Sequence, residues 1–356
     1  MGQIWKTSRD VVVGAYEEIM AYREGRMRPA KTGFKFIDDA MLGGLYPRHA
    51  IAIGARPGVG KSYLAQRIMS NVMDTRINPG AVNYAWVRCE FEMNPVDLML
   101  RSISRGTGKD MRDILIGEMS DSDFDSMRSI LRGESSKRIF YIDKPTSAET
   151  MRDAIWEMMG MFKDKEMVFF SIDHTALIQG RGSTKDNIDY LISVCNEAKL
   201  TFHNIFFLMI SQLNREIDGR KDPKEQAPRQ SDFYQSDTLG QLCSLMIAIN
   251  IPSRYGYDKY MRFPETWFKD LDRFKSKDKR SFETEGLVFN HIVKVRRRML
   301  EEIESLHIEM MRGYESRYPE SGAILGQPSG DKDTEADNER KEELPDLFGD
   351  NEGMPF

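Results

Sequence analysis

One short stretch of this sequence combines the residue types that bind phosphate. In order it reads Ala55, Arg56, Pro57, Gly58, Val59, Gly60, Lys61 and Ser62. Glycines let backbone N–H groups turn inward around phosphate oxygens, a lysine reaches the β and γ oxygens, and a serine hydroxyl ligates Mg²⁺. An apolar run, 49–55, leads into the stretch and a helical pattern, 63–73, follows it. That order predicts a nucleotide-binding phosphate loop, although the usual first glycine is Ala55 here.

A second oxygen ligand is needed to hold the Mg²⁺ water shell, and Asp173 is the candidate. It directly follows the mostly apolar run 167–172, which predicts a buried strand. The carboxyl ends of parallel strands form the edge at which ligands bind in open α/β folds. We therefore expect Ser62 and Asp173 to form the metal site, with ATP and Mg²⁺ bound at this edge.

Hydrolysis also requires a group that activates the attacking water. Glu90 and Glu92 both follow the strand expected at 81–87, and strand alternation would direct both to the same side. Their spacing alone therefore leaves the choice between them open. Gln212 follows another expected strand, 205–210, where it could donate to a γ-phosphate and report its loss to the loop behind it.

The elements that must position these residues are short apolar runs alternating with longer amphipathic stretches. The strand candidates are 49–55, 81–90, 139–143, 167–173, 205–211, 245–251 and 287–295. Most of them lack period-two alternation, as expected for strands that helices cover on both faces. The pattern predicts an α/β fold with a mostly parallel central sheet flanked by helices.

The chain divides into three parts. Within 1–30, apolar residues at near-helical spacing (10–28) predict a linker-type helix that packs on its own domain or on a neighbouring subunit. The body, 31–313, contains an insertion at 252–286 that is rich in aromatic and basic residues and longer than an ordinary connection. Residues 314–356 are dominated by Gly, Pro, Asp and Glu, which predicts a disordered acidic tail.

Charge and cysteine usage narrow the class of protein. The net charge is −5, but residues 327–356 contribute −7 and the remainder is +2, so a polyanionic partner is not excluded. Cys89, Cys195 and Cys243 lie far apart without metal-ligand spacing. No apolar run approaches the roughly 18 residues of a membrane span, and the N-terminus lacks a signal-peptide pattern. We expect a soluble, cytoplasmic protein that contacts no membrane.

Taken together, the motifs resemble the motor domain of DnaB-type replicative DNA helicases, a branch of the RecA-like P-loop NTPases. The resemblance covers residues 31–297 and keeps the family's order. Its segments are Thr32-Gly33-Phe34 with Gly43-Gly44-Leu45, then 55–62, Phe91-Glu92-Met93, Ile172-Asp173, Ser211 to Arg215, Ser231-Asp232-Phe233 and Lys294-Val295-Arg296.

The resemblance implies roles for these residues. Glu92, and not Glu90, would polarise the water, and Gln212 would sense the γ-phosphate. The implied MgATP ligands are Lys61, Ser62 and Asp173. Lys294 and Arg296 would reach into the ATP site of the next subunit, where such a cation stabilises charge on the transferred phosphoryl group. ATP hydrolysis would then require a homo-oligomer, expected to be a hexameric ring.

The sequence also departs from the family pattern. Arg297 and Arg298 follow the Lys-x-Arg motif where the family usually has a glycine, so which arginine acts stays open. The loop after 231–233 lacks the family's arginine and reads Tyr234-Gln235-Ser236-Asp237. His174 replaces a common tyrosine, and we interpret it as a packed or supporting histidine. The family's N-terminal helical domain has no counterpart here beyond the linker-type helix.

Two basic loops are candidates for contact with single-stranded DNA, with a mobile solvated loop as the alternative for the second. Their candidate residues are Arg181, Lys185, Arg220, Lys221 and Arg229. Such binding would be indifferent to sequence and would weaken with salt. The tail closes on Met354-Pro355-Phe356, similar to the tip of bacterial single-stranded-DNA-binding proteins. It is either a docking motif for a primase, helicase loader or other replisome protein, or a solubilising segment.

The resemblance thus leads us to expect an ATP-dependent replicative DNA helicase that translocates 5′ to 3′ on single-stranded DNA as a hexameric ring. Two alternatives stay open. One is a recombinase-like DNA-dependent ATPase that forms filaments. The other is an ATP-switched DNA-binding or scaffold protein of the replisome without unwinding activity, which the altered loop after residue 233 favours.

Overall fold

The computed structural model describes residues 5–144, 146–173, 175, 178–180, 182–220, 225–234, 236–260, 274–275 and 281–311. These residues form two compact units. The larger contains residues 5–98 and 138–311, and the smaller contains residues 99–137. Of the predicted features, the acidic tail, His174, Arg181, Lys221 and much of the insertion lie outside the described residues.

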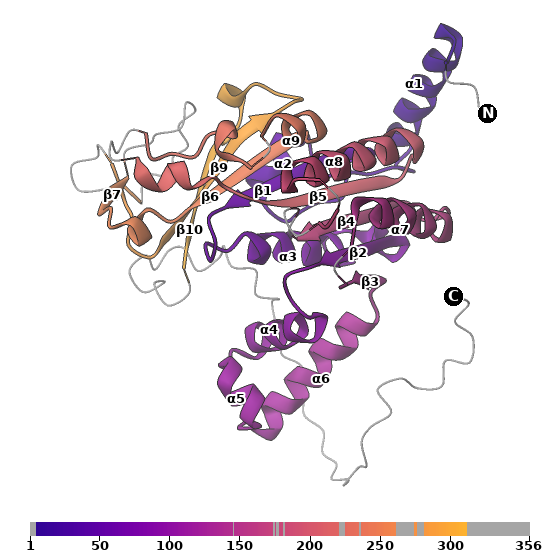
Figure 1. The fold of residues 1–356 in the computed structure, drawn as a ribbon. Helices are drawn as coiled ribbons and strands as arrows, with labels where there is room; N and C mark the ends of the chain where they lie inside the picture. Colours follow the sequence, from indigo (N-terminus) through magenta and orange to yellow (C-terminus); the bar gives the residue numbers. More distant parts are fainter. Residues whose placement is uncertain are drawn as a thin grey trace, which may run out of the picture. The chain divides into compact units, whose positions relative to one another are not determined.

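The larger unit is built on an eight-stranded sheet with the order β10-β9-β6-β1-β5-β4-β2-β3. Six neighbouring strands are parallel, whereas β9 is antiparallel to β6 and β10 is antiparallel to β9 (Figure 1). The strands are β1 (His49–Ala55), β2 (Tyr84–Glu90), β3 (Ile139–Ile142), β4 (Met167–Asp173), β5 (Ile205–Gln212), β6 (Leu245–Asn250), β9 (Leu287–Val295) and β10 (Leu306–Met310). The predicted mostly parallel α/β sheet is confirmed.

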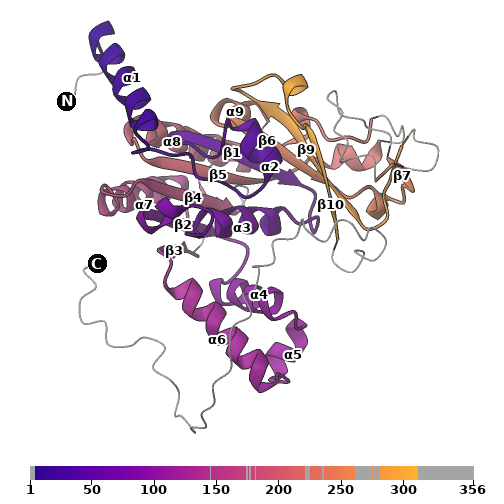
Figure 2. The same cartoon turned by 180° about the vertical axis from the view of Figure 1, so that it is seen from behind.

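Helices cover both faces of this sheet, as the two views in Figures 1 and 2 show. On one face α2 (Lys35–Ala40) and α3 (Lys61–Val72) pack against one core cluster. On the other face α7 (Ala148–Met161), α8 (Thr184–Thr201) and α9 (Ser236–Leu242) pack against a second cluster. Ile51 lies in the first core and Ala52 in the second, so both faces of β1 are apolar. This explains why the strands lack period-two alternation.

The N-terminal helix, predicted within 10–28, is α1 (Ser8–Arg23), and it begins at a capping box formed by Thr7 and Asp10. Its apolar side chains are largely exposed, among them Val12 at 67% and Ile19 at 64%. Most of its apolar face is therefore not packed on the described part of the chain. Across the described residues, no helix combines the length and the apolar character needed to cross a membrane.

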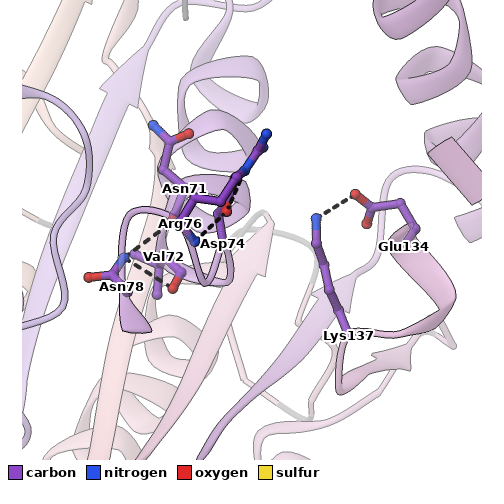
Figure 3. Close-up of polar contacts among 7 residues, drawn as sticks. All are labelled: Asn71, Val72, Asp74, Arg76, Asn78, Glu134 and Lys137. Carbon is purple, nitrogen blue, oxygen red and sulfur yellow. Dashed lines mark hydrogen bonds and ion pairs between the residues drawn. The ribbon is translucent and has the colours of Figure 1, made fainter. Parts of the chain in front are cut away.

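The smaller unit is helical and was not separated from the body by the sequence patterns. It contains most of α4 (Pro95–Thr107) together with α5 (Met111–Ile116) and α6 (Asp121–Ser135). A Cβ at Gly106 would collide with the side chain of Ile130, so α4 and α6 approach closely where glycine removes the side chain. Lys109 pairs with Asp123 at 2.9 Å. At the end of the unit, Lys137 pairs with Glu134 at 2.6 Å (Figure 3).

The predicted insertion is attached to the sheet at both of its ends. The short strands β7 (Lys259–Tyr260) and β8 (Phe282–Glu283) pair with each other, and a 3₁₀ turn, η5 (Pro252–Tyr255), precedes them. Tyr260 is fully buried against Phe289 of β9, with 4.7 Å between ring centroids. Its hydroxyl also hydrogen-bonds His291 at 2.9 Å. The two strands of the insertion, β7 and β8, therefore pack on the core through Tyr260 and Phe282.

Candidate nucleotide-binding and hydrolysis site

The phosphate loop joins β1 to α3, as predicted. Gly58 has φ +73° and Gly60 has φ +106°, both in the left-handed region where a side chain is strained. These two glycines let the loop turn between the strand and the helix. Ala55, in contrast, is the last residue of β1 and has no positive φ. The first position of the motif therefore does not require glycine in this chain.

Lys61, the first residue of α3, is 7% exposed and lies beside Glu92. Its ammonium is 3.8 Å from a carboxylate oxygen of Glu92, whose side chain is about half exposed. Glu90 makes a different contact, because its buried carboxylate bonds the Arg88 guanidinium at 2.6 Å. Burial raises the pKa of the Glu90 carboxyl, and the charge of Arg88 opposes this change. The alternation argument does not apply to Glu92, because β2 ends at Glu90.

The expected metal and sensor residues end neighbouring strands at the same edge of the sheet. Gln212 ends β5 directly opposite Ala55 of β1. Asp173 ends β4 opposite Glu90 of β2 and is buried. The register therefore gathers the phosphate loop, Asp173 and Gln212 at the carboxyl edge of the parallel strands, where the sequence predicted a ligand site.

The residues at this edge fit a magnesium nucleotide. The hydroxyl of Ser62 and the carboxylate of Asp173 are hard oxygen donors of the kind that Mg²⁺ prefers. Mg²⁺ usually takes one or two protein ligands and completes its shell with phosphate and water. In the described part of the chain, no three His, Cys, Asp or Glu side chains converge on a metal site. A bound Mg²⁺ would therefore take Ser62 and Asp173 as protein ligands and its other ligands from the nucleotide phosphates and water.

Two arginines, Arg56 and Arg254, make contacts at the phosphate loop that the sequence does not predict. The guanidinium of Arg56 bonds both carboxylate oxygens of Asp218, at 3.0 and 3.1 Å, and donates to the carbonyl of Leu213 at 2.9 Å. Arg254, at the start of the insertion, donates to the carbonyl of Gly58 at 2.5 Å. The loop is thus tied to the segment that follows Gln212 and to η5. No local pattern marks partners so distant along the chain.

Lys294 and Arg296 lie at the other end of the strands, away from the carboxyl ends that carry the phosphate loop. In the register of β6, Ala55 is opposite Ile249 whereas Val295 is opposite Leu245. Four residues of strand, about 13 Å, therefore separate the two levels. Lys294 donates to the carbonyl of Gly240, and Arg296 donates to the carbonyl of Gln241 at 2.6 Å. One copy of the chain thus does not bring these cations to its own phosphate loop.

The next two arginines are held by other groups. Arg297 contacts the His49 ring nitrogen at 2.6 Å and stacks over Tyr46 at 4.9 Å. Burial has the largest effect on the pKa of His49 and the charge of Arg297 the next largest. Both lower this pKa, to about 4, so the ring is neutral at pH 7. Arg298 donates to the carbonyl of Asp39 at 3.3 Å. Arg296 and Arg297 are both exposed, and Arg296 is the one that shares the carboxyl end of α9 with Lys294.

The predicted DNA-contacting residues differ in their surroundings. Lys185, in the first turn of α8, is exposed. Arg229 is largely exposed and pairs loosely with Glu225 at 3.7 Å. Arg220, however, is part of an ion pair with the buried Asp232, to which it donates at 3.0 Å. The ion pair joins Arg220 to Asp232 of the Ser-Asp-Phe motif, and both residues lie between β5 and α9. Arg220 therefore stabilises the conformation of this connecting segment. Arg181 and Lys221 lie outside the described residues.

The fold and the site define a class. A mostly parallel sheet, a phosphate loop after β1, and acidic and amide residues at the ends of β4 and β5 are the features of a RecA-like ATPase domain.

The family follows from comparison with known proteins. The family described as "DnaB-like helicase C terminal domain" matches residues 30–285, and the chain belongs to it. The resemblance inferred from the motifs is thereby confirmed. The chain is 24% identical over 259 residues to the replicative DNA helicase DnaB of Geobacillus stearothermophilus, covering 71% of this chain and 54% of the relative. It is 25% identical over 252 residues to DnaB of Helicobacter pylori, covering 70% and 47%. The chain thus spans about half the length of the curated relatives it matches.

Solved structures agree on the fold. One solved ATPase domain superposes with a TM-score of 0.63 at 18% identity, covering 85% of this chain and 94% of that one. A DnaB-like replicative helicase, described with its interactions with primase, superposes with a TM-score of 0.59 at 18% identity, covering 82% and 62%. The RecA-like fold predicted from the sequence is confirmed.

Proposed function

We propose that this protein is an ATP-dependent replicative DNA helicase. In this proposal it hydrolyses ATP between the subunits of a hexameric ring and translocates 5′ to 3′ on single-stranded DNA. The observation that carries the proposal is the 3.8 Å approach of Lys61, in the phosphate loop, to Glu92. Membership of the DnaB-like family and the names of the relatives, replicative DNA helicases, support the same activity.

The residues of one copy divide the chemistry among them. Lys61 binds the β and γ oxygens of ATP, and Glu92 takes a proton from the attacking water. Ser62 and Asp173 hold Mg²⁺, which, when bound, neutralises part of the phosphate charge. Gln212, beside Ala55 in the sheet, donates to the γ-phosphate and loses this partner after hydrolysis. The loop that follows it is bonded to Arg56, so the change has a physical path into that loop.

A second copy completes the site. Charge that builds on the transferred phosphoryl group is stabilised by a cation supplied from outside, which speeds phosphoryl transfer by roughly 10³ to 10⁵. Lys294 and Arg296 are such cations, and they lie at the edge of the sheet opposite to the phosphate loop. Head-to-tail stacking of copies would bring one edge to the other. Such heterologous contacts close into a ring when the rotation between copies allows it.

Single-stranded DNA would be bound through its phosphates. Exposed Lys185 and Arg229 are the described candidates, joined by Arg181 and Lys221 from outside the described residues. Arg220 is better suited to shaping its loop through Asp232. A partner of the replisome, a primase or a helicase loader, would contact the acidic tail that ends at Phe356. Interaction with primase is described for one DnaB-like helicase of known structure.

The DNA loop supports a second candidate, an ATP-switched scaffold that binds DNA without unwinding it. The family's arginine is absent after Phe233, and Arg220 is committed to an ion pair. A filament-forming, recombinase-like ATPase is the third candidate. Electron microscopy separates closed rings from open filaments.

The deciding experiment measures ATP hydrolysis and separation of a forked DNA duplex in one preparation. Wild type is compared with Lys61→Ala and Glu92→Gln, and with Lys163→Ala at an exposed site as a control. We expect DNA-stimulated hydrolysis and strand separation by wild type and the control, and neither by the two site variants. DNA-stimulated hydrolysis without strand separation would overturn the helicase proposal and favour the scaffold. A monomer that hydrolyses ATP at full rate at any concentration would overturn the shared site.

A further inference from the structure

Three cations, two from the end of β9 and one from α8, converge on the carboxyl end of α9. Lys294 donates to the carbonyl of Gly240, Arg296 to that of Gln241 at 2.6 Å, and Lys199 to that of Leu242 at 2.7 Å. The last carbonyls of a helix have no intrahelical partner and carry partial negative charge. The three consecutive carbonyls that need partners are thus each bonded by a cation.

Lys199 differs from the other two cations because it is buried. It lies on α8, is 8% exposed, and has the fully buried Cys195 and Cys243 beside it. Burial lowers the pKa of its ammonium, and the neighbouring Cys243 opposes this change. A charged amine in such surroundings costs free energy unless it is hydrogen-bonded, and the Leu242 carbonyl meets that need. An apolar side chain would fill the same space without this cost, so the amine has a specific task at the helix end.

The helix that these cations meet is connected to the loop expected to contact DNA. A Cβ at Gly240 would lie 2.6 Å from the side-chain amide of Gln230, which belongs to η4 (Gln230–Asp232). The same Cβ would lie 3.6 Å from the ammonium of Lys294. On the side of α8, Thr238 bonds the Asp189 carboxylate at 2.7 Å. The position of α9 is therefore set by α8 and by the Ser-Asp-Phe loop, and it in turn sets the resting place of Lys294.

We propose that Lys199 is a positioning residue for hydrolysis in the neighbouring copy. It fixes the carboxyl end of α9, so that the Gly240 and Gln241 carbonyls hold Lys294 and Arg296 at the height and orientation needed to meet the neighbour's ATP. Lys199 itself touches no nucleotide and acts only through α9. The inference rests on the proposed function, because it assigns Lys294 and Arg296 to a site shared between copies.

The arrangement is sensitive to the loss of one cation because each cation bonds a different carbonyl at the end of α9. Arg296 lies close enough to both lysines that its charge lowers the pKa of each, after the larger effect of burial. The helix end offsets this mutual repulsion. Without Lys199 the Leu242 carbonyl loses its partner and the end of α9 is free to fray. Lys294 and Arg296 would then spread over several positions, and a misplacement of about 1 Å is enough to cost about 10²-fold in rate.

The first test replaces the amine by an apolar chain of similar length, Lys199→Met, with Lys163→Met at an exposed site as the matched control. We expect the DNA-stimulated kcat of Lys199→Met to fall by about 10-fold to 10²-fold. Because its own phosphate loop is intact, its KM for ATP should stay within about twofold of wild type. Wild-type turnover by Lys199→Met overturns the inference. Lys199→Gln, whose shorter side chain still carries a donor for the Leu242 carbonyl, should lose less turnover than Lys199→Met. If Lys199→Met does not fold or assemble, a Lys199→Gln protein with wild-type KM for ATP and a several-fold lower kcat supports the inference, and one with wild-type kcat overturns it.

The second test asks in which copy the defect acts. Lys199→Met protomers are mixed with Lys61→Ala protomers, which have intact cations but an inactive phosphate loop. Mixed assemblies then contain sites with a sound Lys61 from one copy and sound cations from the next. We expect turnover above that of either variant alone. No recovery would mean that Lys199 acts on its own copy's site, which overturns the inference.

A reference pair separates this failure from that of the proposed function. Lys294→Ala mixed with Lys61→Ala should recover turnover in the same way. If this pair recovers and the Lys199→Met pair does not, the inference fails alone. If the reference pair stays inactive, the shared site fails, and the role of Lys199 falls with it.

Discussion

The ammonium of Lys61 lies 3.8 Å from the carboxylate of Glu92, and this contact distinguishes two glutamates that the sequence alone does not separate. Glu90, two residues earlier, is buried against Arg88, which bonds it at 2.6 Å. The guanidinium of Arg88 also lies 4.6 Å from the ring centre of Trp86. Glu90 therefore stabilises the end of β2, and Glu92 is the glutamate that lies beside Lys61 of the phosphate loop.

Glu92→Gln should bind ATP with little change and hydrolyse it slowly. The amide keeps the shape of the side chain but does not accept a proton from water, and general-base catalysis contributes roughly 10² to 10⁴ in rate. We expect kcat to fall by about that factor, measured with phosphate release, while a fluorescent nucleotide titrates as for wild type. Unchanged turnover would assign the proton to another group.

Glu90→Gln is the companion variant, and its effect should be on folding. The buried Arg88 would lose its anionic partner, and a weakened buried hydrogen bond to a charged group costs about 1–3 kcal/mol of unfolding free energy. Denaturant titration should record this loss while nucleotide-saturated turnover remains. A folded Glu90→Gln protein with no turnover, beside an active Glu92→Gln protein, would reverse the two roles.

Arg296 should be the arginine that acts in the neighbouring site. Both arginines are exposed, but Arg296 bonds only a carbonyl among its described hydrogen bonds, whereas Arg297 contacts His49 and Tyr46. Arg296→Ala should lower DNA-stimulated kcat by roughly 10³ or more, because a finger arginine contributes at least that. Arg297→Ala should leave kcat near that of wild type and lower the melting temperature instead. The opposite pattern would identify Arg297 as the finger.

The strands of this fold could be predicted because their signal is local. Residues of β1 enter two cores alternately, Ile51 on one side and Ala52 on the other, so the whole run is apolar and visible in the sequence. The last strand, β10 (Leu306–Met310), is not among the predicted strands, although its apolar residues alternate with His307 and Glu309 as in a half-buried strand. Glu309 pairs with His307 and with Arg67, which comes from α3. No pattern near residue 307 announces that pairing.

The same limit applies to the site. The phosphate loop is a contiguous motif, so its eight residues follow from the sequence. Arg254 on Gly58 and Lys199 on Leu242 are contacts between segments far apart along the chain. They depend on how the sheet orders its strands. The helical unit at 99–137 likewise has ordinary amphipathic helices, and nothing in their sequence marks a separate body.

Asn78 should be one of the most sensitive polar residues outside the site. Its side chain accepts from the backbone N–H of Lys31 at 2.7 Å and donates to the carbonyl of Lys31 at 2.9 Å. The same amide nitrogen lies 3.0 and 3.2 Å from the carbonyls of Asn71 and Val72 (Figure 3). Asn78 thereby connects the segment at Lys31, which precedes α2, to the carboxyl end of α3. Asn78→Ala would remove the partner that this side chain provides to the Lys31 N–H and to the Val72 carbonyl, at about 1–3 kcal/mol for each. We expect about 2–4 kcal/mol of unfolding free energy to be lost in denaturant titrations.

The control for Asn78 lies two residues away in the same turn. Arg76 bonds Asp74 at 2.6 Å (Figure 3). Its side chain, however, is 72% exposed. Exposed ion pairs typically contribute no more than about 1 kcal/mol. Arg76→Ala should therefore leave the unfolding midpoint almost unchanged. Equal losses for the two variants would contradict the role given to Asn78.

The stability of the protein should fall between neutral and alkaline pH because of His307. This ring stacks on Phe36 with 4.4 Å between centroids and lies 3.3 Å from Glu304 and 3.4 Å from Glu309. Burial alone would lower the pKa of His307, but the two carboxylates outweigh it and raise the pKa to about 9 from its ordinary 6.5. Because the pKa of His307 is higher in the folded than in the unfolded protein, its protonation stabilises the fold. This contribution to the unfolding free energy is complete below pH 6.5 and is lost as the pH rises through 9.

The expected loss between pH 6.5 and pH 9 is about 3 kcal/mol, the free energy that corresponds to this difference in pKa. Denaturant titrations of wild type at the two pH values should record it. In His307→Gln the difference in unfolding free energy between the two pH values should be much smaller. The glutamine side chain is neutral at both, so no cation beside Glu304 and Glu309 is lost as the pH rises. His203→Gln, at an exposed histidine, should keep the wild-type difference. A pH dependence that survives in His307→Gln would assign the loss to another group.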